Sequence, residues 1–61
     1  MNVVFKEIAG EHVGIGPRGR RWRVVRSVSG WRLEFRDAGD AEYTYAGTHG
    51  TLEQALAEAE R

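Results

Sequence analysis

The sequence predicts an α+β domain in which a three- to four-stranded antiparallel β-sheet carries one C-terminal α-helix on its apolar face. Residues 21–36 alternate between apolar and polar side chains on both sides of a short turn signal, which is typical of a hairpin with one solvated face. Residues 51–61 instead show helical spacing of their apolar side chains. The chain of 61 residues has room for a single domain, residues 1–61.

Before the hairpin, the chain divides into a strand and a loop. Residues 1–8 are predicted to form an N-terminal strand, either at an edge of the sheet or paired with a second copy of the chain. Residues 9–20 contain four glycines together with the only proline of the chain, and we predict a glycine-rich basic loop there.

The hairpin lies within residues 21–46, which we expect to supply the antiparallel strands. A two-residue turn at Ser29-Gly30 would place Arg26 opposite Leu33 and Arg23 opposite Arg36. The apolar face then holds Trp22, Val24, Val28, Trp31, Leu33 and Phe35 with Arg26 as a polar intruder, and the solvated face holds Arg21, Arg23, Val25, Ser27, Arg32, Glu34 and Arg36.

A further strand is predicted at residues 42–46, after a turn at residues 37–40. Its register stays open, because a slip of one residue moves every side chain to the other face. Burial of Glu42 without a partner would be costly, so we favour the register that turns Tyr43 and Tyr45 towards the core.

The clearest element is a helix at residues 51–61. Thr51 and Gln54 have the spacing of a capping box, in which their side chains satisfy free N–H groups of the first turn. Glu53 at the start and Arg61 at the end suit the helix dipole. The apolar stripe that follows the cap consists of Leu52, Ala55, Leu56 and Ala59.

Charge is unevenly distributed along the chain although the net charge is zero. Residues 12–36 carry seven arginines against a single glutamate, whereas residues 37–61 carry six acidic side chains against a single arginine. Such asymmetry indicates an anionic partner or head-to-tail association. The alternative interpretation is that the arginines reflect only a GC-rich genome.

Several function classes find no support in the residues. The chain has no cysteine, and its two histidines, His12 and His49, have no convergent carboxylates with which to hold a metal. No nucleophile–base grouping is indicated, so we expect a non-enzymatic protein without cofactor or metal. No long apolar run or secretory leader is present, and we expect a cytoplasmic protein without membrane association.

The segment Pro17-Arg18-Gly19-Arg20-Arg21 resembles the AT-hook, whose core is Pro-Arg-Gly-Arg-Pro. The resemblance implies an extended segment that inserts its guanidinium groups into a narrow A·T minor groove. Arg21 stands where the family has its closing proline. The alternative interpretation is a solvated basic loop.

A second resemblance concerns the order of elements. The stretches at residues 22–24, 31–37 and 47–55 are similar in pattern to the small arm-site DNA-binding domain of phage-type integrases, a three-stranded sheet followed by a helix. The pattern covers roughly half of the chain, is shared by small bacterial and phage proteins, and indicates a fold more than a function. It implies that the exposed sheet face enters the major groove, and the matching positions are Arg21, Arg23, Arg32, Glu34 and Arg36.

Two functional hypotheses follow. The first is a DNA-binding accessory or regulatory module of bacterial or phage origin that contacts double-stranded DNA through Arg18, Gly19, Arg20, Arg21, Arg23, Arg32 and Arg36. The alternative is a protein–protein interaction module, a dimeric adaptor or a host-directed phage inhibitor, with complementary basic and acidic faces. In both, the open N-terminal strand predicts a homo-oligomer. An opposed Arg23–Arg36 pair would be tolerated with an anion between the side chains, or with Glu34 and Glu42 as diagonal partners.

Overall fold

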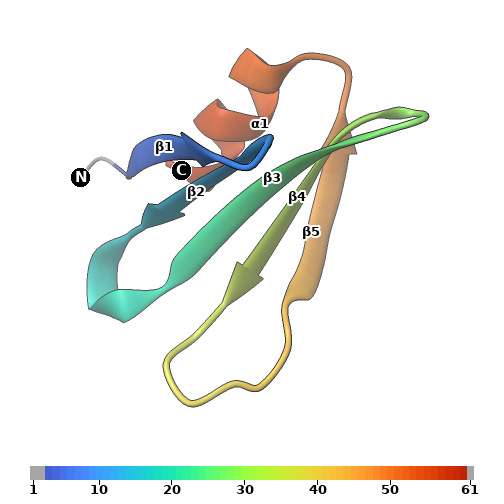
Figure 1. Ribbon diagram of the computed structural model, residues 1–61. Coiled ribbons are helices and arrows are strands. Elements are labelled where there is room, and N and C mark those ends of the chain that lie inside the picture. Colours follow the sequence, from blue (N-terminus) through green and yellow to red (C-terminus); the bar gives the residue numbers. More distant parts are fainter. Residues whose placement is uncertain (1–2, 61) are drawn as a thin grey trace.

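The computed structural model describes residues 3–60 and shows one antiparallel sheet with one helix on it (Figure 1). The α+β class and the C-terminal helix are confirmed, but the sheet has five strands, in the order β1-β2-β3-β4-β5, where we expected three or four. The elements are β1 (Val4–Ile8), β2 (Glu11–Ile15), the 3-10 turn η1 (Pro17–Gly19), β3 (Arg21–Ser27), β4 (Gly30–Arg36), β5 (Thr44–His49) and α1 (Leu52–Ala59).

The additional strand is β2, which lies in the segment predicted as a loop. It pairs with β1 through a tight turn in which Ala9 and Gly10 both have positive φ angles, of 54° and 83°. Gly14 makes the pairing possible, since a Cβ atom there would lie 2.7 Å from the Val4 carbonyl oxygen. Gly14 therefore allows two backbones to approach closely within a strand. The loop predicted for residues 9–20 is wrong over residues 11–15, which form β2. The edge position predicted for the N-terminal strand is confirmed.

The β3–β4 hairpin forms with a register different from the predicted one. Its turn lies at residues 28–29, so that Arg26 opposes Trp31 and Arg23 opposes Glu34. Gly30 belongs to β4, where the neighbouring backbone leaves no room for a side chain, because a Cβ atom would overlap the His49 carbonyl oxygen. Because the pairing moves by two residues, each strand keeps its predicted face. Val28 is the exception, since it is fully exposed at the tip.

The core lies between the helix and one half of the sheet. Val24, Leu33, Ala55 and Ala59 form its buried centre, and half-buried Phe5, Trp22, Trp31, Leu52 and Leu56 pack around it. The predicted helix and its apolar stripe are therefore confirmed, and the Thr51 hydroxyl accepts a hydrogen bond from the Gln54 amide at 3.1 Å. Arg61, expected to end the helix, lies outside the described residues.

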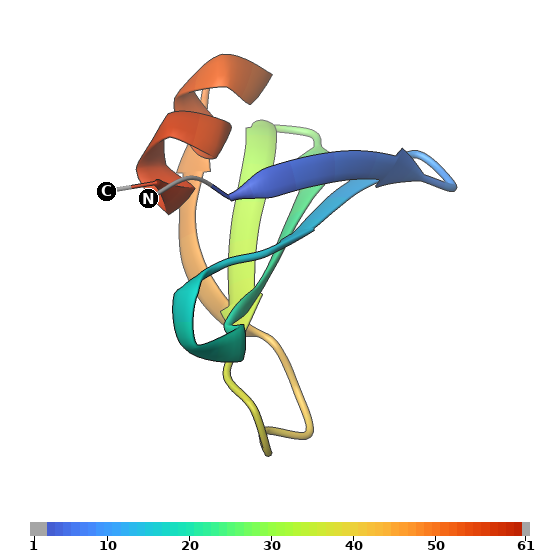
Figure 2. The same cartoon turned by 90° about the vertical axis from the view of Figure 1, so that its left-hand side faces the viewer.

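The sheet is strongly twisted, so that β1 runs across the direction of β4 (Figure 2). The helix covers the end of the sheet near the β3–β4 turn, and the loop between β4 and β5 projects from the opposite end. The side of the sheet that faces away from α1 is called the outer face below.

The register of β5 contradicts the prediction for the two tyrosines. Tyr45 opposes Glu34, so it lies on the outer face and is 54% exposed. The ladder is irregular between Leu33 and Glu34, where Ala46 is an additional residue. Glu42 lies in the exposed loop before β5. Neither register would therefore bury its carboxylate, and the cost of burial does not decide between the two registers. The expectation that Tyr43 and Tyr45 point into the core is wrong.

Candidate nucleic-acid interface

The outer face collects most of the arginines that the sequence pointed to. Strand registers place basic side chains from β1, β3 and β4 on this face, interleaved with aliphatic and aromatic side chains. Its described members with side chains are Val4, Lys6, Ile8, Glu11, Val13, Ile15, Arg21, Arg23, Val25, Ser27, Arg32, Glu34, Arg36, Tyr45 and Thr48. Basic groups outnumber carboxylates, so the face is cationic although the chain is neutral overall.

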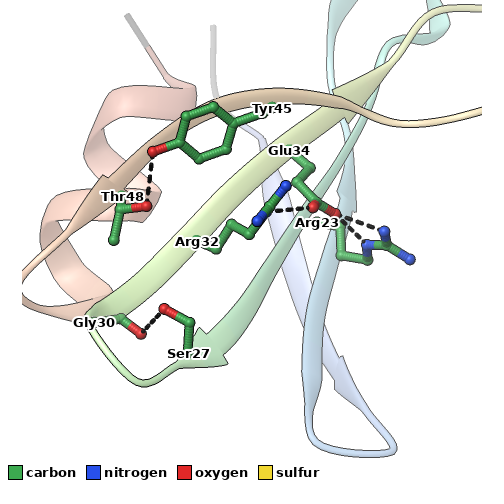
Figure 3. Close-up of polar contacts among 7 residues, drawn as sticks. All are labelled: Arg23, Ser27, Gly30, Arg32, Glu34, Tyr45 and Thr48. Carbon is green, nitrogen blue, oxygen red and sulfur yellow. Dashed lines mark hydrogen bonds and ion pairs between the residues drawn. The ribbon is translucent and has the colours of Figure 1, made fainter.

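Two of these arginines are held by a buried carboxylate. The Glu34 carboxylate, whose side chain is only 11% exposed, lies between Arg23 and Arg32 (Figure 3). Arg23 donates to Oε1 from Nε at 2.9 Å and from Nη2 at 2.5 Å, and Arg32 donates to Oε2 from Nε at 2.7 Å. The hydrogen bond to Glu34 raises the pKa of Arg23 above its ordinary value. Glu34 thus stabilises both guanidinium groups in fixed positions.

Arg21 and Arg36 form the like-charge pair of the face. They are directly opposed on β3 and β4, and neither takes part in the ion pairs found within residues 3–60. The predicted opposition of Arg23 and Arg36 is therefore wrong, and the shifted hairpin register brings Arg21 into the place of Arg23. Like charges in directly opposed positions destabilise a sheet unless a counter-charge lies between them.

Tyr43 lies beside this pair, at the end of the loop before β5. The Arg23 guanidinium lies 4.0 Å from the centre of its ring, and the Arg36 guanidinium lies 5.4 Å from it. Tyr45 has a similar contact with Arg32 at 4.8 Å, and its hydroxyl lies 2.8 Å from the Thr48 hydroxyl (Figure 3). Aromatic rings and guanidinium groups therefore alternate along the outer face.

The Arg-Gly-Arg segment is folded into a tight turn. Arg18 is exposed with φ at 63°, and Gly19 follows at 75°. Arg20 donates to both carboxylate oxygens of Asp37, at 2.6 and 3.1 Å, with its guanidinium 4.2 Å from the centre of the Phe35 ring. This ion pair lowers the pKa of Asp37 and raises that of Arg20. The segment does not have the extended shape that the AT-hook resemblance implies.

A hollow of about 460 Å³ opens on the outer face between the β1–β2 hairpin and Tyr43. Its apolar lining includes Val4 and Ile15, which are 73% and 63% exposed. Sequence reasoning missed this feature, because it depends on the β1–β2 pairing. The full lining consists of Val4, Lys6, Val13, Gly14, Ile15, Arg21, Trp22 and Tyr43.

Other kinds of site receive little support from the described part of the chain. Residues 3–60 contain no cluster of three or more metal-ligating side chains, and none of their helices is long and apolar enough to cross a membrane. His12 packs edge-on against Trp31, with ring centres 5.9 Å apart. The Nε2 atom of His49 is buried without a hydrogen-bond partner within these residues.

Comparison of the chain with protein-family models, curated proteins and solved structures finds no match. A fold by itself does not assign a function, because unrelated activities share the same architecture. The chemistry of the outer face is therefore the basis for a functional proposal.

Proposed function

We propose that the protein is a small non-enzymatic accessory module that binds DNA through its outer face. The observation that carries the proposal is the opposed pair Arg21 and Arg36, which has no carboxylate partner among the described residues. A phosphate group between the two guanidinium groups would replace their repulsion by two charge-assisted hydrogen bonds. Phosphates supply most of the affinity in protein–DNA complexes, and arginine matches their geometry.

The remaining cations support this assignment with different roles. Arg23 and Arg32 keep N–H groups that are not used by Glu34, and their positions are fixed before any ligand arrives. Lys6 extends the cationic surface on β1, the outermost strand. Arg20 is bound to Asp37 and is not expected to contact DNA, whereas Arg18 is exposed in the turn before β3.

A protein–protein interaction module is the second candidate, and the sheet edges are the observation that favours it. The sheet ends in β1 on one side and β5 on the other, so each pairs with only one strand of the described chain. On β1, Val4 and Ile8 are 73% and 57% exposed. Unpaired edges with exposed aliphatic side chains recruit further strands, from a partner or from a second copy.

DNA titrations at several salt concentrations test the first candidate. We expect Arg21→Ala and Arg36→Ala each to weaken binding, and to lower the salt slope by about 0.9 for each duplex phosphate that the variant no longer neutralises. Folding stability should stay equal or rise slightly, because a like-charge pair is removed. Arg26→Ala is the matched control, since Arg26 is exposed on the helix side of β3 and its removal changes the net charge equally.

The outcomes separate the two candidates. Weakening confined to the Arg21 and Arg36 variants supports DNA binding through the outer face. Unchanged affinity in both variants, or equal weakening by Arg26→Ala, would refute it. In that case, loss of a co-purifying protein partner on Val4→Asp or Ile8→Asp would support the interaction module.

A further inference from the structure

The hollow between the β1–β2 hairpin and Tyr43 combines three kinds of lining. Val4, Val13 and Ile15 provide an apolar floor, Lys6 and Arg21 contribute positive charge, and Tyr43 contributes an aromatic ring. Its lining within residues 3–60 includes no aspartate or glutamate. Its volume of about 460 Å³ lies in the range of pockets that take small organic groups. The lining therefore suits a ligand that joins an apolar planar body to a negative charge.

The backbone around the hollow restricts what can bind. Both β2 and β3 are interior strands, paired on each side, so their N–H and C=O groups are already used in the sheet. A peptide docked here would find few partners for its own backbone groups. Bases and phosphates do not have this requirement, because a base can be bound through its face and a phosphate through cations.

Tyr43 provides the aromatic ring of the lining. Its ring is half-buried and contacts the guanidinium groups of Arg23 and Arg36, which limits its freedom to move. Arg36 also belongs to the opposed pair proposed to bind phosphate, and Arg21 belongs to both the pair and the hollow. A phosphate at the pair would thus lie next to the entrance of the hollow.

We infer that the hollow receives an unpaired base, so that the protein prefers single-stranded DNA to duplex. This inference rests on the proposed DNA binding and specifies its substrate class. In a duplex the bases are stacked and paired, and their faces are not accessible to a pocket. In a single strand one base enters the hollow against Tyr43 and Ile15, and the adjacent phosphates lie against Arg21, Arg36 and Lys6. Because every base has a π-face, the site tolerates different base sequences.

Three labelled probes of equal length test the inference by fluorescence anisotropy: an oligothymidylate, a duplex, and an abasic single strand that keeps the phosphates. We expect the oligothymidylate to bind more tightly than the other two. Tyr43→Leu should weaken oligothymidylate binding about tenfold, since the ring that stacks on the base is removed, and should leave binding to the abasic strand unchanged. Tyr45→Leu is the matched control, because Tyr45 lies on the same face but does not line the hollow.

A second pair of variants avoids dependence on the Tyr43 loop. Ile15→Asp places a carboxylate in the hollow, and Ile8→Asp adds the same charge to another exposed position of the outer face. We expect only Ile15→Asp to abolish the preference for the oligothymidylate, with thermal unfolding curves showing that both variants are folded.

The results with the three probes distinguish failure of the base-binding hollow from failure of DNA binding as a whole. Equal binding of the three probes, with dependence on Arg21 and Arg36 retained, would overturn the base-binding hollow and leave DNA binding intact. Equal effects of Tyr43→Leu and Tyr45→Leu would also overturn it. Absence of binding to all three probes would refute the proposed function itself.

Discussion

The interaction of Glu34 with Arg23 and Arg32 couples the stability of the sheet to the charge of its outer face. Glu34 is the buried charged residue of the described chain, at 8% exposure, and it accepts hydrogen bonds from both arginines. Glu34→Gln keeps the size of the side chain but removes its charge. The amide offers one acceptor oxygen, and its NH₂ group faces guanidinium donors with which it cannot bond.

The structure sets the magnitude of the effect. Removing one partner from a fully buried ion pair costs about 3–5 kcal/mol. Arg23 and Arg32 are 31% and 48% exposed, so both regain hydration once the carboxylate is removed. We therefore expect Glu34→Gln to lower the free energy of unfolding by about 2 kcal/mol. This is a substantial part of the roughly 3–9 kcal/mol expected for a domain of this length.

Urea unfolding followed by tryptophan fluorescence measures this decrease, with Glu42→Gln as the control. Glu42 is exposed in the loop before β5, and the substitution changes the net charge by the same amount. DNA titrations on the same two proteins give a second result: because Glu34→Gln removes a negative charge from the outer face itself, it should increase affinity more than Glu42→Gln does. A stability difference below about 0.5 kcal/mol between the variants, the range of ordinary surface substitutions, would refute the role assigned to Glu34.

The remaining predictions concern the core, the helix, pH and assembly. Leu33 is fully buried, so Leu33→Ala should cost about 3–5 kcal/mol and leave the protein largely unfolded by circular dichroism. Thr51→Ala removes the helix cap and should cost about 1 kcal/mol in urea unfolding, whereas Thr51→Ser should cost little. Because the pKa of Asp37 lies below its ordinary value of 3.8, its ion pair with Arg20 stabilises the fold above that pH, and this stabilisation disappears as pH falls through the lowered value. Asp37→Asn should therefore reduce stability at pH 7 and flatten its decline in acid, and parallel pH profiles of the two proteins would contradict this. Pairing of the open β1 edges predicts a dimer in sedimentation, and a species of 6.9 kDa at high concentration would contradict it.

Local sequence alone was sufficient for the helix and for the two faces of the central hairpin. The cap at Thr51 and the apolar stripe lie within a few residues of each other, so the helix is recognisable from local sequence, although a helix of eight residues depends on its packing against the sheet for stability. The faces of β3 and β4 were predicted correctly even though the turn was misplaced. Side chains alternate with period two, and a shift of the pairing by two residues leaves the face of each residue unchanged.

Contacts between distant segments decided the rest. The sequence predicted Gly14 in a loop and Gly30 in a turn, but both lie in strands. Each is a glycine at a place where a neighbouring backbone approaches too closely for a Cβ atom. Tyr45 faces outward because the bulge at Ala46 sets its register and the Arg32 guanidinium contacts its ring. The local pattern of apolar and polar residues does not show where two backbones approach closely or where a bulge lies.

Part of the candidate site was likewise predictable from the sequence, and part depended on the tertiary structure. The arginine-rich strands were identifiable from composition and alternation, and their exposed face was expected. The sequence did not predict which arginines would lack a carboxylate partner. The ion pairs of Glu34 and Asp37 form only after the strands have paired and the loop has folded. The hollow joins β1 and β2 to Tyr43, segments that are far apart in the chain, and Lys6 and Ile15 therefore entered the site only with the tertiary structure. The sequence by itself determined the charge and alternation of single strands. The sheet determined which charges meet, because ion pairs and pockets depend on distances that strand register sets.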